Sequence, residues 1–143
     1  EFSYFQSEGD NVSERMVGLM EDEIWNMIRM DPGSLPVGQF SIYPGLFHTR
    51  LMHRPFEAEQ ASATLVEEGV EKIYTVNFAS GRTFEWHFGR QFPYTIYSWT
   101  ESFTGNNGEP QITTATLKKQ LFLPYWQYNG NEDIILRDSL GIE

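Results

Sequence analysis

Short runs of alternating apolar and polar residues, separated by turn residues, fill most of the chain from Gln39 to Leu123. No stretch between these runs is long enough to form a crossover helix. Because parallel strands need a connection of a dozen or more residues, the runs are expected to pair as antiparallel neighbours. The sequence predicts about seven strands, which span residues 39–43, 46–54, 56–67, 71–79, 82–88, 94–103 and 111–123.

The strands predicted at 71–79 and 82–88 have one strongly aromatic face. Successive side chains of a strand point to opposite sides, so alternate residues can be sorted by face. The aromatic face holds Tyr74, Val76, Phe78, Phe84, Trp86 and Phe88. A sheet this large in a chain of this length must curl, and its aromatic side needs a cover.

The cover is predicted to be an N-terminal helix over residues 11–30. The run Asn11-Val12-Ser13-Glu14 has the form of a capping box, and Asp31-Pro32-Gly33 ends the helical pattern. Apolar residues recur at helical spacing between these signals, at Val12, Met16, Leu19, Met20, Ile24, Met27 and Ile28. We therefore expect this amphipathic helix to lie across the aromatic face and to bury Met20, Ile24 and Met27.

A second, short helix is predicted at 132–140, with Gly141 as its left-handed stop. The expected fold class is α+β: a strongly curved antiparallel sheet or incomplete barrel with an N-terminal amphipathic helix and a short C-terminal helix. Residues 11–143 are predicted to form a single globular domain. Residues 1–10 are expected to be an extended arm that fits a tag or processing remnant.

Composition excludes several functional classes. The 143 residues contain no cysteine, which excludes a disulfide framework, thiol catalysis and Cys-ligated metals. The net charge of −10 argues against binding to a phosphate backbone, so no nucleic-acid partner is predicted. No apolar run is long enough to span a membrane. The low lysine content, with many Thr, Asn, Tyr and Trp residues, favours a secreted or periplasmic location over a cytoplasmic one.

The strongest local anomaly is a basic cluster in this acidic chain, formed by His48, Arg50, His53 and Arg54. Arginine offers a planar fork to a carboxylate or phosphate, and histidine adds a donor or exchanges a proton. The four side chains converge only if the predicted strand bends near residues 51–52. A competing interpretation pairs the two arginines with acids at 57–59 and 67–68 as ordinary surface ion pairs.

Two further residues are candidates for acid/base chemistry. Glu85 and His87 lie two apart on one predicted strand and share a face, so they would form a couple in a cavity and a hydrophilic surface in solvent. The three histidines and Glu85 lack the ligand spacing of zinc motifs, and no metal site is predicted. No motif in the sequence indicates a cofactor.

A second anomaly follows Pro124, where Tyr125, Trp126 and Tyr128 lie close together. These rings would extend an aromatic binding surface with Trp86 and Trp99, or they would fasten the C-terminal helix to the sheet.

Our leading hypothesis is a small-ligand-binding domain. Its aromatic-lined cavity, with Trp86 and Trp99, would hold an anionic or amphipathic small molecule, and His48, Arg50, His53 and Arg54 would lie at the mouth. One alternative is an enzyme that uses Glu85 and His87 in the same cavity. Another is a module that binds a protein partner or a carbohydrate through exposed aromatic residues.

Overall fold

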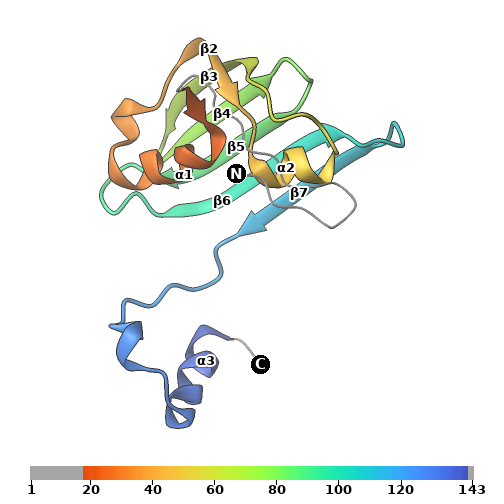
Figure 1. Cartoon of the computed structure of the whole chain (residues 1–143). Coiled ribbons are helices and arrows are strands. Elements are labelled where there is room, and N and C mark those ends of the chain that lie inside the picture. The colour runs from red at the N-terminus through yellow and green to blue at the C-terminus, as the bar shows by residue number, and fades with distance from the viewer. Residues whose placement is uncertain (1–17, 142–143) are drawn as a thin grey trace.

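The computed structural model describes residues 18–141, and its central feature is one sheet of seven strands (Figure 1). In chain order the elements are β1 (Leu19–Met20), α1 (Glu21–Met30), η1 (Pro32–Ser34), β2 (Gly38–Tyr43), α2 (Leu46–Leu51), β3 (Glu59–Glu68), β4 (Glu71–Phe78), β5 (Thr83–Gly89), β6 (Ile96–Thr104), β7 (Pro110–Thr116), η2 (Tyr125–Gln127), η3 (Asn131–Ile134) and α3 (Ile135–Leu140).

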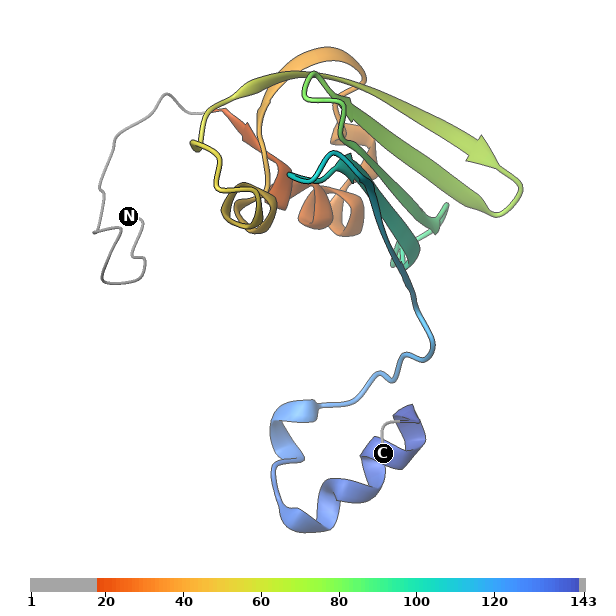
Figure 2. The same cartoon turned by 90° about the vertical axis from the view of Figure 1, so that its right-hand side faces the viewer.

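The strands follow one another across the sheet in chain order. Neighbours from β2 to β7 are antiparallel, whereas β1 runs parallel to β2. The sheet is curved and not closed, and α1 lies against its concave side (Figure 2). The predicted α+β fold with a curved sheet is confirmed. The expectation of purely antiparallel pairing is wrong at β1, because α1 and η1 supply the crossover that a parallel pair needs.

The core lies between α1 and the concave side of the sheet. Ile24 and Ile28 of α1 are fully buried there, and Trp25 lies edge-on to Trp86 at 5.6 Å between ring centroids. The predicted aromatic face is confirmed, since its six side chains all belong to the core. Of the residues expected to be buried in the helix, Ile24 is buried, but Met20 and Met27 are only half-buried.

The N-terminal helix is shorter than predicted within the described residues. Leu19 and Met20 pair with β2 as a short strand, and α1 begins at Glu21. Its first turn is closed by Glu23, whose carboxylate accepts the backbone N–H of Met20 at 3.2 Å. The capping box predicted at residues 11–14 lies outside the described residues. The predicted end of the helix at Met30 is confirmed.

The strand predicted at 46–54 is wrong, because residues 46–51 form the helix α2. Acidic residues at the start of α1 accept hydrogen bonds from the N-terminal amides of α2. The carboxylate of Glu21 accepts the N–H of Gly45 at 2.8 Å, and that of Asp22 accepts the N–H of Leu46 at 3.4 Å. Carboxylates stabilise the free amides of a helix N-terminus. The helix therefore depends on a contact with residues 24 positions earlier in the chain, which alternation within the segment does not reveal.

The hairpins are close to their predicted positions. Gly69 and Gly81 adopt φ values of +56° and +85° in the turns β3–β4 and β4–β5, and only glycine adopts such a backbone conformation readily. The C-terminal helix is also present, as η3 and α3, and Gly141 with φ 71° ends it as expected. The last strand is shorter than predicted. It ends at Thr116 instead of Leu123, and the chain then leaves the sheet (Figure 1).

Candidate functional site

Three charged side chains meet inside the domain, between α1 and the sheet. Arg82 is 2% exposed, and its guanidinium donates to both carboxylate oxygens of Glu21, at 2.5 and 2.6 Å. Its Nε donates to Glu101 Oε1 at 2.6 Å. Burial by itself lowers the pKa of Arg82, but the hydrogen bonds and charges of Glu21 and Glu101 outweigh burial and raise it. The guanidinium therefore stays charged, and we call these three residues with His48 the Arg82 network.

His48 connects this network to the surface. It lies on α2 and is buried, with Nδ1 3.3 Å from Glu101 Oε1 but not aligned for a hydrogen bond. Burial by itself raises the pKa of Glu101, but the proximity of His48 and the charge of Arg82 outweigh burial and lower it. The His48 ring also packs edge-on against Phe103 at 5.0 Å.

The helix α2 also borders an open groove of about 210 Å³. His48 and Thr49 contribute to its wall from the helix, and Arg54 and Glu57 from the chain that leads to β3. The groove is lined by Pro44, His48, Thr49, Arg54, Pro55, Glu57, Ala58 and Glu59. Its size suits a ligand smaller than the molecules that fill pockets of about 300–1,000 Å³.

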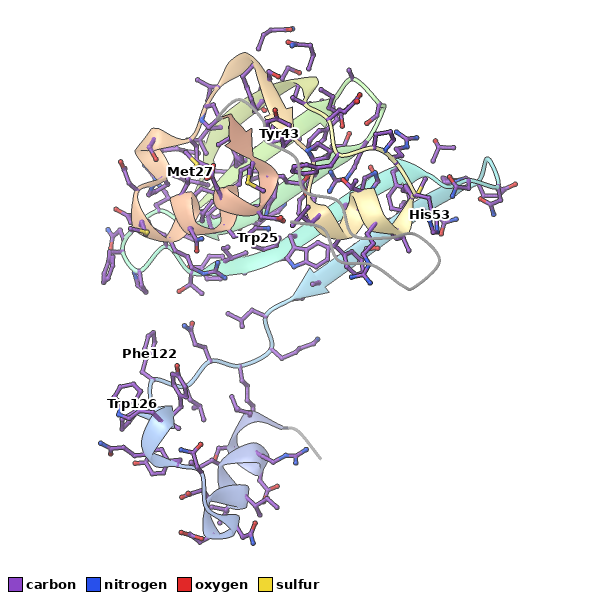
Figure 3. All side chains as sticks on the ribbon, viewed as in Figure 1. Trp25, Met27, Tyr43, His53, Phe122 and Trp126 are labelled. Carbon is purple, nitrogen blue, oxygen red and sulfur yellow. The ribbon has the colours of Figure 1, made fainter. Side chains whose placement is uncertain are left out.

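The structure brings two members of the predicted basic cluster together in this groove, His48 and Arg54. The other two do not line it: Arg50 is exposed on α2, and His53 is exposed just after the helix with φ 51° (Figure 3). The chain does bend near residues 51–52, because α2 ends there. The bend holds Arg54 against the C-terminal half of the helix, where its backbone N–H donates to the carbonyl of Thr49 at 3.0 Å.

The ion pairs offered as a competing interpretation do not form at Arg54. Within residues 18–141, no carboxylate lies within ion-pair distance of its guanidinium. Glu67 pairs with Lys72 and Arg90 instead, and Glu59 accepts the backbone N–H of Ser80 at 3.0 Å. Arg54 is thus a cation at the edge of a groove, and none of the described carboxylates occupies its hydrogen-bonding fork.

Comparisons with protein-family models, curated proteins and solved structures gave no match. None of the described helices is long and apolar enough to cross a membrane. In the part of the chain that the structure describes, no three His, Asp or Glu side chains gather as a metal site.

The predicted acid/base couple lies on the outer, convex face of the sheet. His87 Nε2 is 2.9 Å from Glu85 Oε1, and His87 Nδ1 is 3.5 Å from Glu71 Oε1. Thr75 donates its hydroxyl to the second oxygen of Glu85 at 3.2 Å. The couple therefore exists as a hydrogen-bonded pair, but it lies apart from the residues of the groove. Its proposed role in catalysis stays a prediction.

His87 gives the fold a pH dependence that can be measured. Partial burial lowers the pKa of His87, but the hydrogen bonds and charges of Glu85 and Glu71 outweigh it and raise the pKa above 6.5. This contribution to stability is fully present below about pH 6.5 and is lost as the pH rises through the raised folded value. Urea unfolding at pH 5.5 and 8.5 should therefore show a larger loss of stability for the parent than for His87→Gln. An equal loss in both proteins would contradict this assignment.

Of the two tryptophans predicted to contact a ligand, Trp86 lies inside the core and Trp99 packs against it. Trp86 is 0% exposed, and Phe84 stacks on it at 4.0 Å between centroids. Trp99 is half-buried, and Trp25 covers it edge-on at 6.0 Å. The concave space that was expected to hold a ligand is thus occupied by side chains of α1. The binding role of Trp86 and Trp99 stays a prediction.

Sequence reasoning missed Glu21, Arg82 and Glu101, although each carries a recognisable signal. Arg82 alternates with Phe84 and Trp86, so it belongs to the aromatic face of its strand. Glu101 falls on the same face as Trp99 and Phe103 by the same count, and Glu21 shares a helix face with Ile24 and Ile28. Charged residues at apolar positions of three separate elements indicate a buried ion network.

Proposed function

We propose that the protein binds a small anionic ligand in the groove beside α2. The observation that carries the proposal is the Arg54 guanidinium, which forms no ion pair with the described residues and shares the groove with His48. A guanidinium donates two parallel hydrogen bonds to a carboxylate or a phosphate, and this geometry supplies both charge and orientation.

His48 would make the binding depend on pH. Its Nδ1 faces Glu101, whereas the ring itself lines the groove. A histidine in general changes charge between pH 5 and 8. The second positive charge would add to the attraction of Arg54, so we expect the ligand to bind more tightly at pH 6 than at pH 8.

The acidic residues of the groove set a limit on affinity. Glu57 and Glu59 lie on its wall, and their charges repel an anion. Glu59 is engaged with the N–H of Ser80, so Glu57 is the residue to alter. A ligand that carries a hydrogen-bond donor beside its anionic group would turn this repulsion into a contact. We therefore favour small hydroxy acids, sugar acids and phosphate esters over simple anions.

The proposal is tested by calorimetric titration of glucuronate, octanoate and inorganic phosphate at pH 6 and pH 8. For the anion that binds, we expect Arg54→Ala to weaken binding about 10- to 100-fold, because a charge-assisted bidentate contact is lost. Arg54→Lys keeps the charge without the fork and should give an intermediate affinity. Glu57→Gln should strengthen binding.

Arg137→Ala is the matched control, because Arg137 is exposed on α3, far along the chain from the groove. It removes the same charge and should leave the affinity unchanged. Equal binding to the parent, Arg54→Ala and Arg137→Ala would remove the groove from the site. Binding that strengthens from pH 6 to pH 8 would exclude the role given to His48.

A further inference from the structure

The two edges of the sheet differ in a way that bears on assembly. At one edge, β1 is only two residues long, and short edge strands are poor templates for further pairing. At the other edge, β7 spans seven residues, Pro110–Thr116, and pairs with β6 alone. Its outward backbone groups have no hydrogen-bond partner within residues 18–141.

The strand β7 also lacks the features that usually protect an edge. Its sequence, Pro-Gln-Ile-Thr-Thr-Ala-Thr, contains no charged side chain, whereas natural edge strands commonly carry lysine or inward-pointing charges. The only proline is its first residue, where it leaves the following amides free. Ile112 is 71% exposed on its outer face. An uncharged edge rich in β-branched residues is a good surface for adding another strand.

Charge favours a second copy at this edge over other faces of the molecule. The chain has a net charge of −10, so two copies repel each other over most of their surfaces. The edge of β7 is uncharged, and an antiparallel pair of identical strands is self-complementary about a two-fold axis. We propose that β7 pairs with β7 of a second copy and joins two sheets into one.

The chain that follows β7 supports a partner at this edge. Residues 117–135 carry large apolar side chains, and the arm that holds them extends away from its own sheet (Figure 2). Phe122, Tyr125 and Trp126 are 79%, 75% and 65% exposed. Antiparallel pairing about the centre of β7 brings Thr116 of one copy opposite Pro110 of the other. The arm then continues beside the second copy, where its apolar side chains can be covered.

The first test is sedimentation velocity of the full chain at about 1–100 µM. We expect a species of twice 16.6 kDa. The double variant Ile112→Lys/Thr114→Lys should weaken association at least about tenfold, because it places like charges face to face across the two-fold axis. Thr64→Lys is the matched control, since Thr64 is exposed on the same convex side of the inner strand β3. It should associate as the parent does.

The second test locates the contact and uses the absence of cysteine in the chain. Single cysteines are introduced at each position from 111 to 116, and at Thr64 as a control. Two sulfurs cross-link only when their Cα atoms approach to about 4.4–6.8 Å. We expect disulfide-linked dimers from one or two neighbouring positions of β7 and none from Thr64→Cys.

Three results would overturn the proposal. The parent could sediment as a monomer at the highest concentration, or the lysine pair could associate as tightly as the parent. Alternatively, dimers could form without any cross-link along β7, which would move the contact to the arm or to another surface. None of these results would affect the anion site, because the groove is lined by residues 44–59 and not by β7.

Discussion

Arg82→Ala is expected to destabilise the domain by about 3–5 kcal/mol, because it leaves the buried carboxylate of Glu21 and the half-buried carboxylate of Glu101 without their cation. Glu21 is 4% exposed, and Arg82 is its only ion-pair partner among the described residues. Glu21 also holds the N–H of Gly45, so its displacement should loosen the start of α2. Urea unfolding at pH 7, followed by far-UV circular dichroism, measures the change.

Two further variants separate this effect from the loss of a surface charge. Arg137→Ala removes an exposed arginine and should change stability by less than about 0.5 kcal/mol. Arg82→Met combined with Glu21→Gln and Glu101→Gln removes all three charges at similar volume, and should recover much of the lost stability. If Arg82→Ala were as stable as Arg137→Ala, the buried network would have no structural importance.

Ile24→Asp should abolish cooperative folding. Ile24 is 0% exposed where α1 packs on the sheet, so the variant loses apolar contacts and buries an unpaired carboxylate. Both costs together are comparable to the whole free energy of unfolding of a typical domain, about 5–15 kcal/mol. Thermal unfolding followed by near-UV circular dichroism should show no transition.

Asn26→Asp is the matched control for this variant. It adds the same charge to the same helix at an exposed position, and should unfold at nearly the parent temperature. A melting transition of Ile24→Asp that coincides with that of Asn26→Asp would contradict the placement of α1 over the aromatic face.

The candidate site was only partly predictable. The sequence singled out His48 and Arg54 because basic residues are few in an acidic chain, and both line the groove. It placed them on a strand, where His48 and Arg54 would share one face with Arg50. The helix α2 instead turns His48 inward to Glu101, and Arg50 is exposed on the helix outside the groove. The pairing of His87 with Glu85 could be predicted from their spacing. The second ion pair of His87, with Glu71 of β4, could not be predicted in this way, because Glu71 lies on another strand.

The features that depend on near neighbours in the chain were predictable from the residue pattern. Alternation over a few residues set the aromatic face of β4 and β5, and glycines at 69 and 81 set the turns that join the strands. Other features depend on residues that are distant in the chain and meet only in the folded domain. Helix α2 forms because Glu21 and Asp22 reach its amides, and Arg82 is buried because two elements supply carboxylates to it. These features are stabilised by contacts between residues far apart in the chain, and the free energy of such contacts cannot be inferred from a local sequence pattern.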